Sequence, residues 1–203
     1  MLNPNARRVL VPNVPTVRPS GNISNGRQRS VVMVGRIGPQ KDPEYYVALK
    51  QEVTSVDPAV NFIWVGDGNA RQKSNLEDAG VTVTGWLDDA ALVAELEAAG
   101  IYAHSARYEG FPLSVLDAAA CGLPVVARAI PAFDGSPVAQ FPSVASHAEA
   151  IVRYFSSSTG TSDLAGLNAK LLDVMNSETH RQALLKLYER MESVSLSPVA
   201  GDL

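Results

Sequence analysis

The chain has 203 residues, of which 46% are hydrophobic, and a formal net charge of −4 at pH 7. This length and composition are typical of one globular α/β domain with a tail. The acidic balance argues against a nucleic-acid-binding protein, which needs clustered lysine and arginine to contact phosphates.

The compartment is indicated by features that the sequence lacks. The single cysteine, Cys121, excludes an intrachain disulfide and is expected on a buried helix face. No apolar run approaches the ~18 residues of a membrane span, and the first residues do not resemble a signal peptide. We therefore expect a cytoplasmic protein. His104, His147 and His180 lie too far apart in sequence to suggest a metal site, and we expect the latter two on the surface.

Short apolar runs alternate with helical patterns through most of the chain. Residues 8–12 are predicted as a strand cut off by proline, and residues 13–30 as a linker rich in Pro, Ser, Asn and Gly. Further strands are predicted at 31–34, 61–65, 81–84, 101–104 and 125–128, with a short last one within 136–141. Helices are predicted at 43–55, 70–79, 88–99 and 113–121. This alternation predicts a doubly wound, Rossmann-like parallel sheet with right-handed crossovers.

The pattern weakens after residue 131. Ser146 and Glu149 have the spacing of a capping box, which predicts a helix that continues to about residue 155. Extra helices are predicted at 163–174 and 178–192, the second with an apolar stripe at helical spacing. The stripe consists of Leu184, Leu187, Tyr188 and Met191. We divide the chain into an interdomain strand and linker (1–29), a ligand-binding domain (30–176), and an amphipathic helix with a tail (177–203).

The most informative segment lies between residues 108 and 126. Glu109 stands in a Gly-Phe-Pro turn, and Asp117 follows one turn into the next helix, for which Pro112 suits the first position. Free backbone amides at a helix N-terminus bind anions, and carboxylates accept hydrogen bonds from hydroxyls. The segment therefore predicts a ligand that carries both phosphate and sugar hydroxyl groups.

Loops after the other strands hold further candidates. Arg36 and Lys41 lie five residues apart after the first strand, where both can point to the carboxyl end of the sheet. Two interpretations are open: both side chains bind the ligand, or both are ordinary solvated charges on an exposed loop. Gly66 and Gly68 contact the ligand or form a simple strand-to-helix turn, because Arg71 replaces the third glycine of a dinucleotide fingerprint.

Several neighbouring side chains leave two interpretations open. Trp86, beside Leu87, stacks on a base or packs in the interior, and His104 touches the ligand or only ends its strand. We expect Tyr108 to pack inside the protein. Glu95 and Glu97 are expected on a solvated helix face.

Residues 109–126 resemble the donor-site signature of the retaining GT-B glycosyltransferases, the glycosyl transferases of group 1 or family 4-like type. The chain matches the pattern E-G-F-x-x-x-x-x-E-A-x-A-x-G-x-P-V-V except at the second acid, which is Asp117. The loop 35–42 is similar to the family's G-R-L-x-x-x-K-G, with Asp42 in place of the usual glycine.

The resemblance covers roughly residues 9–155 and implies the C-terminal, donor-binding half of a GT-B fold. It implies catalytic roles for Arg36 and Lys41, on the donor diphosphate, and for Glu109, which would orient the sugar hydroxyls. It further implies donor contacts at a second group of positions, with Asp117 on the ribose. These are Gly35, Gly66, Gly68, Trp86, Leu87, Gly110, Phe111, Pro112, Leu113 and Asp117.

The same resemblance implies a reaction and its partners. A UDP-, GDP- or ADP-sugar would be the donor, transfer would retain the anomeric configuration, and no metal or other cofactor would be needed. The partner would be an acceptor-binding N-terminal domain or subunit, through which any peripheral association with membranes is expected. Without that part we expect no activity. The alternatives are a non-catalytic nucleotide-sugar-binding or assembly module and another GT-B enzyme such as a sugar-nucleotide epimerase.

Overall fold

The computed structural model describes residues 10–21, 26–156 and 160–195. A parallel six-stranded sheet with the order β3-β2-β1-β4-β5-β6 lies at its centre. The strands are β1 (Ser30–Val34), β2 (Asn61–Val65), β3 (Thr82–Gly85), β4 (Ile101–His104), β5 (Val125–Arg128) and β6 (Ala139–Phe141). The strands predicted between residues 31 and 128 are confirmed to within one residue at each end.

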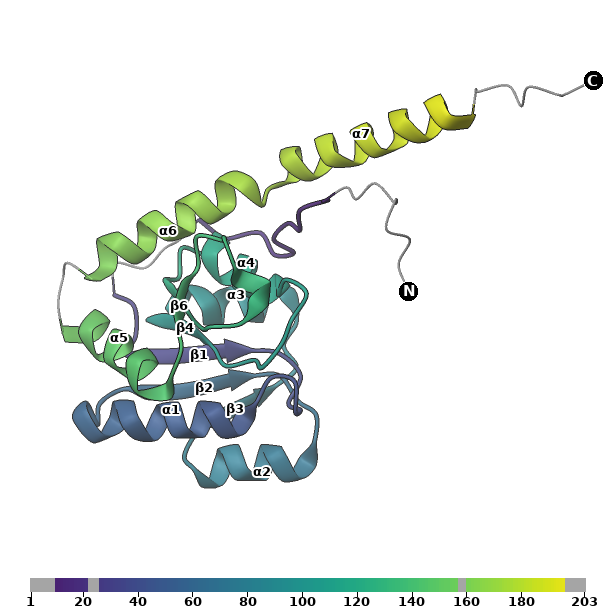
Figure 1. The fold of residues 1–203 in the computed structure, drawn as a ribbon. Coiled ribbons are helices and arrows are strands. Elements are labelled where there is room, and N and C mark those ends of the chain that lie inside the picture. The colour runs from purple at the N-terminus through teal and green to yellow at the C-terminus, as the bar shows by residue number, and fades with distance from the viewer. Residues whose placement is uncertain (1–9, 22–25, 157–159, 196–203) are drawn as a thin grey trace, which may run out of the picture.

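Helices cover both faces of the sheet (Figure 1). One face carries α1 (Pro43–Val56), α2 (Ala70–Asp78) and α5 (Val144–Ser156). The other carries α3 (Asp89–Ala98), α4 (Leu113–Ala120) and α6 (Gly160–Val174), whereas α7 (Ser177–Ser195) extends away from the sheet. This arrangement confirms the predicted doubly wound α/β class. No helix in the described ranges is long and apolar enough to cross a membrane.

The strands with continuous apolar runs lie in the middle of the sheet, where helices bury both of their faces. In β1, Val32 lies beside Ile63 of β2 and Tyr102 of β4, and Val32 and Tyr102 are fully buried. The hydroxyl of Tyr46, on α1, makes hydrogen bonds to the backbone carbonyls of Val31 (3.0 Å) and Ile63 (2.9 Å). These bonds fix the start of α1 against β1 and β2.

The direction of chain progression reverses between β1 and β4. From β1 the chain moves outward to β2 and β3, then returns to β4 on the other side and moves outward to β5 and β6. The loops that leave β1 and β4 therefore start in opposite directions at the carboxyl end of the sheet. Ligands of open α/β sheets bind at such a point.

Two glycines let the loop after β2 touch the loop after β1. A Cβ at Gly66 (φ 139°) would lie 2.2 Å from the carbonyl oxygen of Gly35, and one at Gly68 would lie 2.2 Å from that of Ile37. The indole of Trp64 donates to the same Gly35 oxygen at 2.8 Å. The pair thus has a structural role in loop packing; a contact of either glycine with a ligand stays a prediction.

The segment before β1 packs against the domain as an irregular strap. Residues 10–12 form no strand, and the other part of that predicted strand, residues 8 and 9, lies outside the described residues. Ser20 donates to Glu97 of α3 through its amide (2.8 Å) and its hydroxyl (2.5 Å). Arg27 donates to the carbonyls of Leu96, Glu97, Ala99 and Cys121, at the C-terminal ends of α3 and α4. The predicted linker is therefore attached to the domain on both sides of residues 22–25.

Several surface predictions are wrong because distant elements bury the side chains. Glu97 is 7% exposed beneath the strap, and Glu95 is half-buried, so that burial raises its carboxyl pKa. His147 is fully buried, and burial lowers its pKa to about 3. Conversely, Trp86 and Tyr108 are 63% and 62% exposed and do not pack in the interior.

The remaining helix details differ slightly from the predictions. Helix α5 begins at Val144, and its cap is Ser143, whose hydroxyl accepts from the amide of Ser146 (3.2 Å); Glu149 instead pairs with Arg153. On α7, His180 is half-buried and donates from Nδ1 to the carbonyl of Pro12 (2.6 Å), whereas Tyr188 of the predicted stripe is 61% exposed. The side chain of Met191 lies outside the described residues. Cys121 is buried as predicted, and burial raises its thiol pKa to about 11.

The glycine contact gives a stability prediction. Gly66→Ala is expected to lower the free energy of unfolding by about 3 kcal/mol, because the new methyl group meets a backbone carbonyl and the residue keeps a positive φ. Gly38→Ala, in the same region, should change it by less than about 1 kcal/mol, because its new methyl group meets open space and its φ is not positive. Urea unfolding of the two variants measures the difference, and equal losses would contradict the contact.

Candidate functional site

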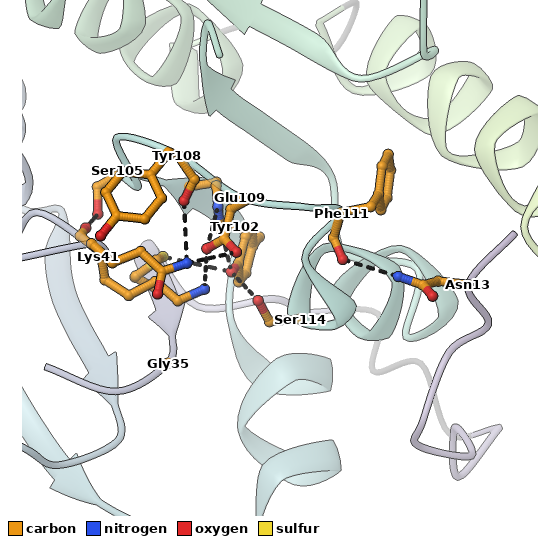
Figure 2. A network of polar contacts seen from close by, with 12 residues as sticks. Asn13, Gly35, Lys41, Tyr102, Ser105, Tyr108, Glu109, Phe111 and Ser114 are labelled. Carbon is orange, nitrogen blue, oxygen red and sulfur yellow. Dashed lines mark hydrogen bonds and ion pairs between the residues drawn. The ribbon is translucent and has the colours of Figure 1, made fainter. Parts of the chain in front are cut away.

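An ion pair joins the loops that leave β1 and β4 (Figure 2). Lys41 precedes α1 and Glu109 follows β4, and their Nζ and Oε1 atoms are 2.5 Å apart. The two side chains are only 15% and 9% exposed. A cation and a carboxylate far apart in sequence therefore meet at one rim of the sheet, as the sequence led us to expect.

Backbone and side-chain hydrogen bonds fasten these loops together. The hydroxyl of Ser105 donates to the carbonyl of Lys41 (2.6 Å), and the amide of Arg107 donates to that of Gln40 (2.9 Å). The amide group of Gln40 donates to the carbonyl of Tyr108 (3.2 Å) and to Oε2 of Glu109 (3.1 Å). The position of Lys41 relative to Glu109 is thus fixed by contacts on both sides of the pair.

Asp42 anchors the end of the first loop in an unusual backbone conformation. Its φ is +53°, in the left-handed region that favours glycine, which is the residue that the G-R-L-x-x-x-K-G pattern has at this position. Its buried carboxylate accepts from Arg107 Nε (2.7 Å) and Nη2 (3.1 Å), from Arg128 Nη1 (2.6 Å) and from the amide of Tyr45 (3.3 Å). The carboxylate therefore caps α1 and ties it to the ends of β4 and β5.

The surroundings keep both carboxylates of the rim ionised. Burial alone would raise the pKa of Asp42, but hydrogen bonds from Arg107 and Arg128 outweigh it, so the pKa lies below its ordinary value. Burial would likewise raise the pKa of Glu109, and here His104 and Lys41 outweigh it. The rim at neutral pH thus holds negative charges that are already paired with cations.

Part of the loop before α4 is exposed to solvent, and part packs against the interior. Pro112 is the N-cap of α4, one residue before the predicted position, and makes no side-chain capping bond. Phe111 packs edge-to-face on buried Phe133 at 5.6 Å, and its carbonyl accepts from Asn13 Nδ2 at 3.1 Å (Figure 2). Gly110 is exposed and Leu113 is 44% exposed. The uncapped helix start beside the ion pair is therefore open to an anion.

Other predicted site residues lie farther from the ion pair. Arg36 is exposed and makes no hydrogen bond or ion pair with the described residues, so its guanidinium is free to meet a ligand. Trp86 and half-buried Leu87 follow β3, at the edge of the sheet two strands away from β1. In the described ranges no hydrogen bond or ion pair joins Trp86 to Lys41 or Glu109.

Asp117 holds the N-terminal strap to α4. Its Oδ1 accepts from the amides of Thr16 (2.6 Å) and Val17 (3.3 Å), and its Oδ2 from the hydroxyl of Thr16 (2.8 Å). A carboxylate offers about four acceptor positions, so about one remains, on Oδ2. Asp117 is 5% exposed. Its carboxylate already has a structural role, which the sequence did not predict.

A groove of about 540 Å³ lies next to the loop before α4. The strap, the loop around residue 134 and the end of α6 line it, through residues such as Leu10, Phe111, Asp134 and Val174. The described residues contain no cluster of three or more side chains suited to a metal ion.

Sequence reasoning missed Gln40, Arg107 and Arg128, which make the rim rigid. The available signal was position: Arg107 and Arg128 stand at or just after the ends of two neighbouring strands, where side chains of a parallel sheet converge. Gln40 gave no comparable signal, because only the folded loop brings it to Glu109.

Residues 28–157 match the family described as Glycosyl transferases group 1. The chain belongs to this family. D-inositol 3-phosphate glycosyltransferase from Segniliparus rotundus is 34% identical over 122 residues, which cover 55% of this chain and 26% of that protein. The chain covers between 26% and 30% of the length of the curated relatives that it matches.

Solved structures of glycosyltransferases share the fold. Sucrose-phosphate synthase from Thermosynechococcus elongatus superposes with a TM-score of 0.73 and 20% identity, over 88% of this chain and 50% of that one. The C-terminal domain of a glycosyl transferase group 1 family protein from Francisella tularensis gives 0.61 and 18%, over 77% of this chain and 94% of that one. At these identities the likeness shows the fold, here that of GT-B enzymes.

The Asp42 anchor of this group 1 glycosyltransferase chain can be tested directly. Asp42→Ala is expected to lower the free energy of unfolding by about 3 kcal/mol, because it removes a helix cap and leaves two arginines without their partner. Asp42→Gly should cost about 1 kcal/mol less, since glycine tolerates the positive φ.

The pH dependence of the free energy of unfolding is the control for these two Asp42 variants. Because the folded pKa of Asp42 is depressed, its contribution is present above the unfolded pKa of about 3.9 and is lost as pH falls through the folded pKa. Chemical unfolding at pH 7 and pH 3 should therefore show a smaller gap between wild type and Asp42→Gly at pH 3. A gap that does not narrow would contradict the ion-pair account.

Proposed function

We propose that this chain is the C-terminal, donor-binding part of a retaining glycosyltransferase that takes its sugar from a nucleoside diphosphate sugar. The proposal depends above all on the Lys41–Glu109 pair at the point where the strand order reverses between β1 and β4. Family membership makes sugar transfer the reaction class, and the likeness to a separately solved C-terminal domain supports the assignment to that half.

The proposed donor binds with its diphosphate between the two loops. Arg36 and Lys41 supply positive charge. The backbone N–H groups of Gly110, Phe111 and Leu113, at the uncapped start of α4, supply hydrogen-bond donors. During transfer the bond from the anomeric carbon to the diphosphate breaks and negative charge grows on the leaving phosphate. Fixed cations and amides at that position stabilise the growing charge.

Glu109 is proposed to hold the sugar. Its carboxylate stays ionised and is held by Lys41, Gln40 and the surrounding loop, so it can accept hydrogen bonds from sugar hydroxyls in a fixed orientation. Transfer further requires the acceptor, which we assign to a separate N-terminal domain or subunit. A non-catalytic nucleotide-sugar-binding module is the second candidate, supported by the engagement of Asp117 with Thr16.

Removal of the two cations tests the diphosphate assignment. Arg36→Ala and Lys41→Ala should each weaken binding of UDP, GDP or ADP about tenfold or more, and the double variant should abolish it. Isothermal titration calorimetry with each nucleotide and its sugar conjugate measures the affinities. The base that binds most tightly also identifies the donor class.

The matched control is Arg29→Ala. It removes the same charge from the residue just before β1, at the opposite end of the strand that leads to Arg36. Its affinity for the nucleotide should equal that of wild type. Unchanged affinity in the double variant of Arg36 and Lys41 would refute the diphosphate site.

The proposed ribose contact of Asp117 needs a separate test. Asp117→Asn should weaken binding of the nucleoside diphosphate about tenfold and leave binding of inorganic pyrophosphate unchanged, because only the nucleotide has ribose hydroxyls. Thr16→Val, which removes the hydroxyl on Oδ2, should not weaken binding of either ligand. If Asp117→Asn and Thr16→Val behave alike in calorimetry, Asp117 serves only to hold the strap.

A further inference from the structure

His104 has a ring nitrogen without a hydrogen-bond partner beside the Lys41–Glu109 pair. It is the last residue of β4 and is fully buried. Its Nε2 lies 3.7 Å from Oε1 of Glu109, which is too long for a hydrogen bond, and has no hydrogen-bond partner among the described residues. Buried polar atoms are nearly always partnered, so an orphan that faces a site carboxylate indicates a contact formed in another state.

Neighbouring hydroxyls determine where the imidazole proton lies. Nδ1 of His104 is 3.2 Å from the hydroxyl of Tyr102, which is 2.9 Å from that of Ser114. Tyr102 has one proton to give. The hydroxyl is placed to donate to Ser114. With this proton turned to Nδ1 and Ser114 donating to the Tyr102 oxygen instead, the proton of His104 is on Nε2 and points toward Glu109. The opposite order would place a lone pair against the carboxylate.

The charge state of His104 follows from its burial. Burial lowers the pKa of His104 and outweighs the opposite effect of Glu109, so the ring is neutral at neutral pH. The ring also packs edge-to-face on Phe133 at 5.7 Å, which limits its rotation. These contacts hold a neutral imidazole in place, and with Tyr102 as the donor to Nδ1 the ring carries an Nε2–H that points toward Glu109.

Lys41 and His104 both face the Oε1 atom of Glu109. Lys41 Nζ is the nearer donor, at 2.5 Å from Oε1. On the proposed function, the diphosphate of the donor competes for this ammonium group. When Lys41 turns to the phosphate, Glu109 loses its closest partner although its side chain is only 9% exposed. The only change then needed for a new hydrogen bond is a shift of less than about 1 Å between Nε2 and Oε1.

We propose that His104 is a positioning residue. It donates a hydrogen bond to Glu109 in place of Lys41 when the ligand draws Lys41 away. It keeps the carboxylate oriented toward the sugar hydroxyls of the bound donor. This inference rests on the proposed function, and it assigns the effect of His104 to the sugar rather than to the diphosphate.

The test compares two ligands that differ only in the sugar. Calorimetry is run with UDP and UDP-glucose, or with GDP and GDP-mannose if only guanine nucleotides bind. His104→Phe should weaken binding of the nucleotide sugar about tenfold and that of the nucleoside diphosphate less than about twofold. His104→Gln, whose amide can present an N–H donor near the place of Nε2, should recover most of the loss.

His147→Phe is the matched control. His147 is a second fully buried imidazole, stacked on Phe141 at 5.5 Å and beside the Tyr45 hydroxyl, on the α1 and α5 side of the sheet. Its replacement should leave both affinities unchanged. An equal loss for both ligands in His104→Phe, or the same selective loss in His147→Phe, would overturn the positioning role.

A spectroscopic measurement decides the matter even where a variant does not fold. The ¹⁵N shifts of the imidazole ring in the wild-type chain should show a neutral ring protonated on Nε2. A ring protonated on Nδ1 would refute the inference. Failure of the wild-type chain to bind any of these nucleotides would instead refute the proposed function, so the two failures are distinguishable.

Discussion

The contact between Lys41 and Glu109 depends on the reversal of strand order between β1 and β4. The two loops on either side of this point leave the sheet in opposite directions, and they stay together only through their own contacts. Ser105, Gln40 and Arg107 supply those contacts. The groups that the proposed function uses lie on one of these loops or on the helix that follows, whereas Trp86 and Leu87 lie at the edge of the sheet.

The fold was largely predictable because the central strands are continuous apolar runs, which burial on both faces requires. The runs at 31–34 and 101–104 led directly to β1 and β4, and the intervening helical patterns indicated parallel order. Element ends were less certain: Pro112 caps α4 instead of starting it, and Ser143 instead of Ser146 caps α5. Such details depend on a single hydrogen bond rather than on a pattern.

The site was predictable where its residues stand in a recognisable sequence motif. Lys41 and Glu109 were found because each stands in a motif, but the partners of Asp42 and the burial of His147 and Glu97 arise from residues far away in sequence. Ser20 covers Glu97 from a segment whose composition predicts a linker. Polar side chains buried by distant segments carry no local signal, which is why the surface predictions for them are wrong.

The enclosed thiol of Cys121 has a practical consequence for work on this chain. The sequence contains one cysteine, and at pH 8 a thiol with a pKa of about 11 is roughly one part in a thousand thiolate. Maleimide reagents would therefore react far more slowly with Cys121 than with a cysteine introduced on the surface. An engineered cysteine at an exposed position such as Tyr188 would accept a fluorophore or spin probe without first removing the native residue.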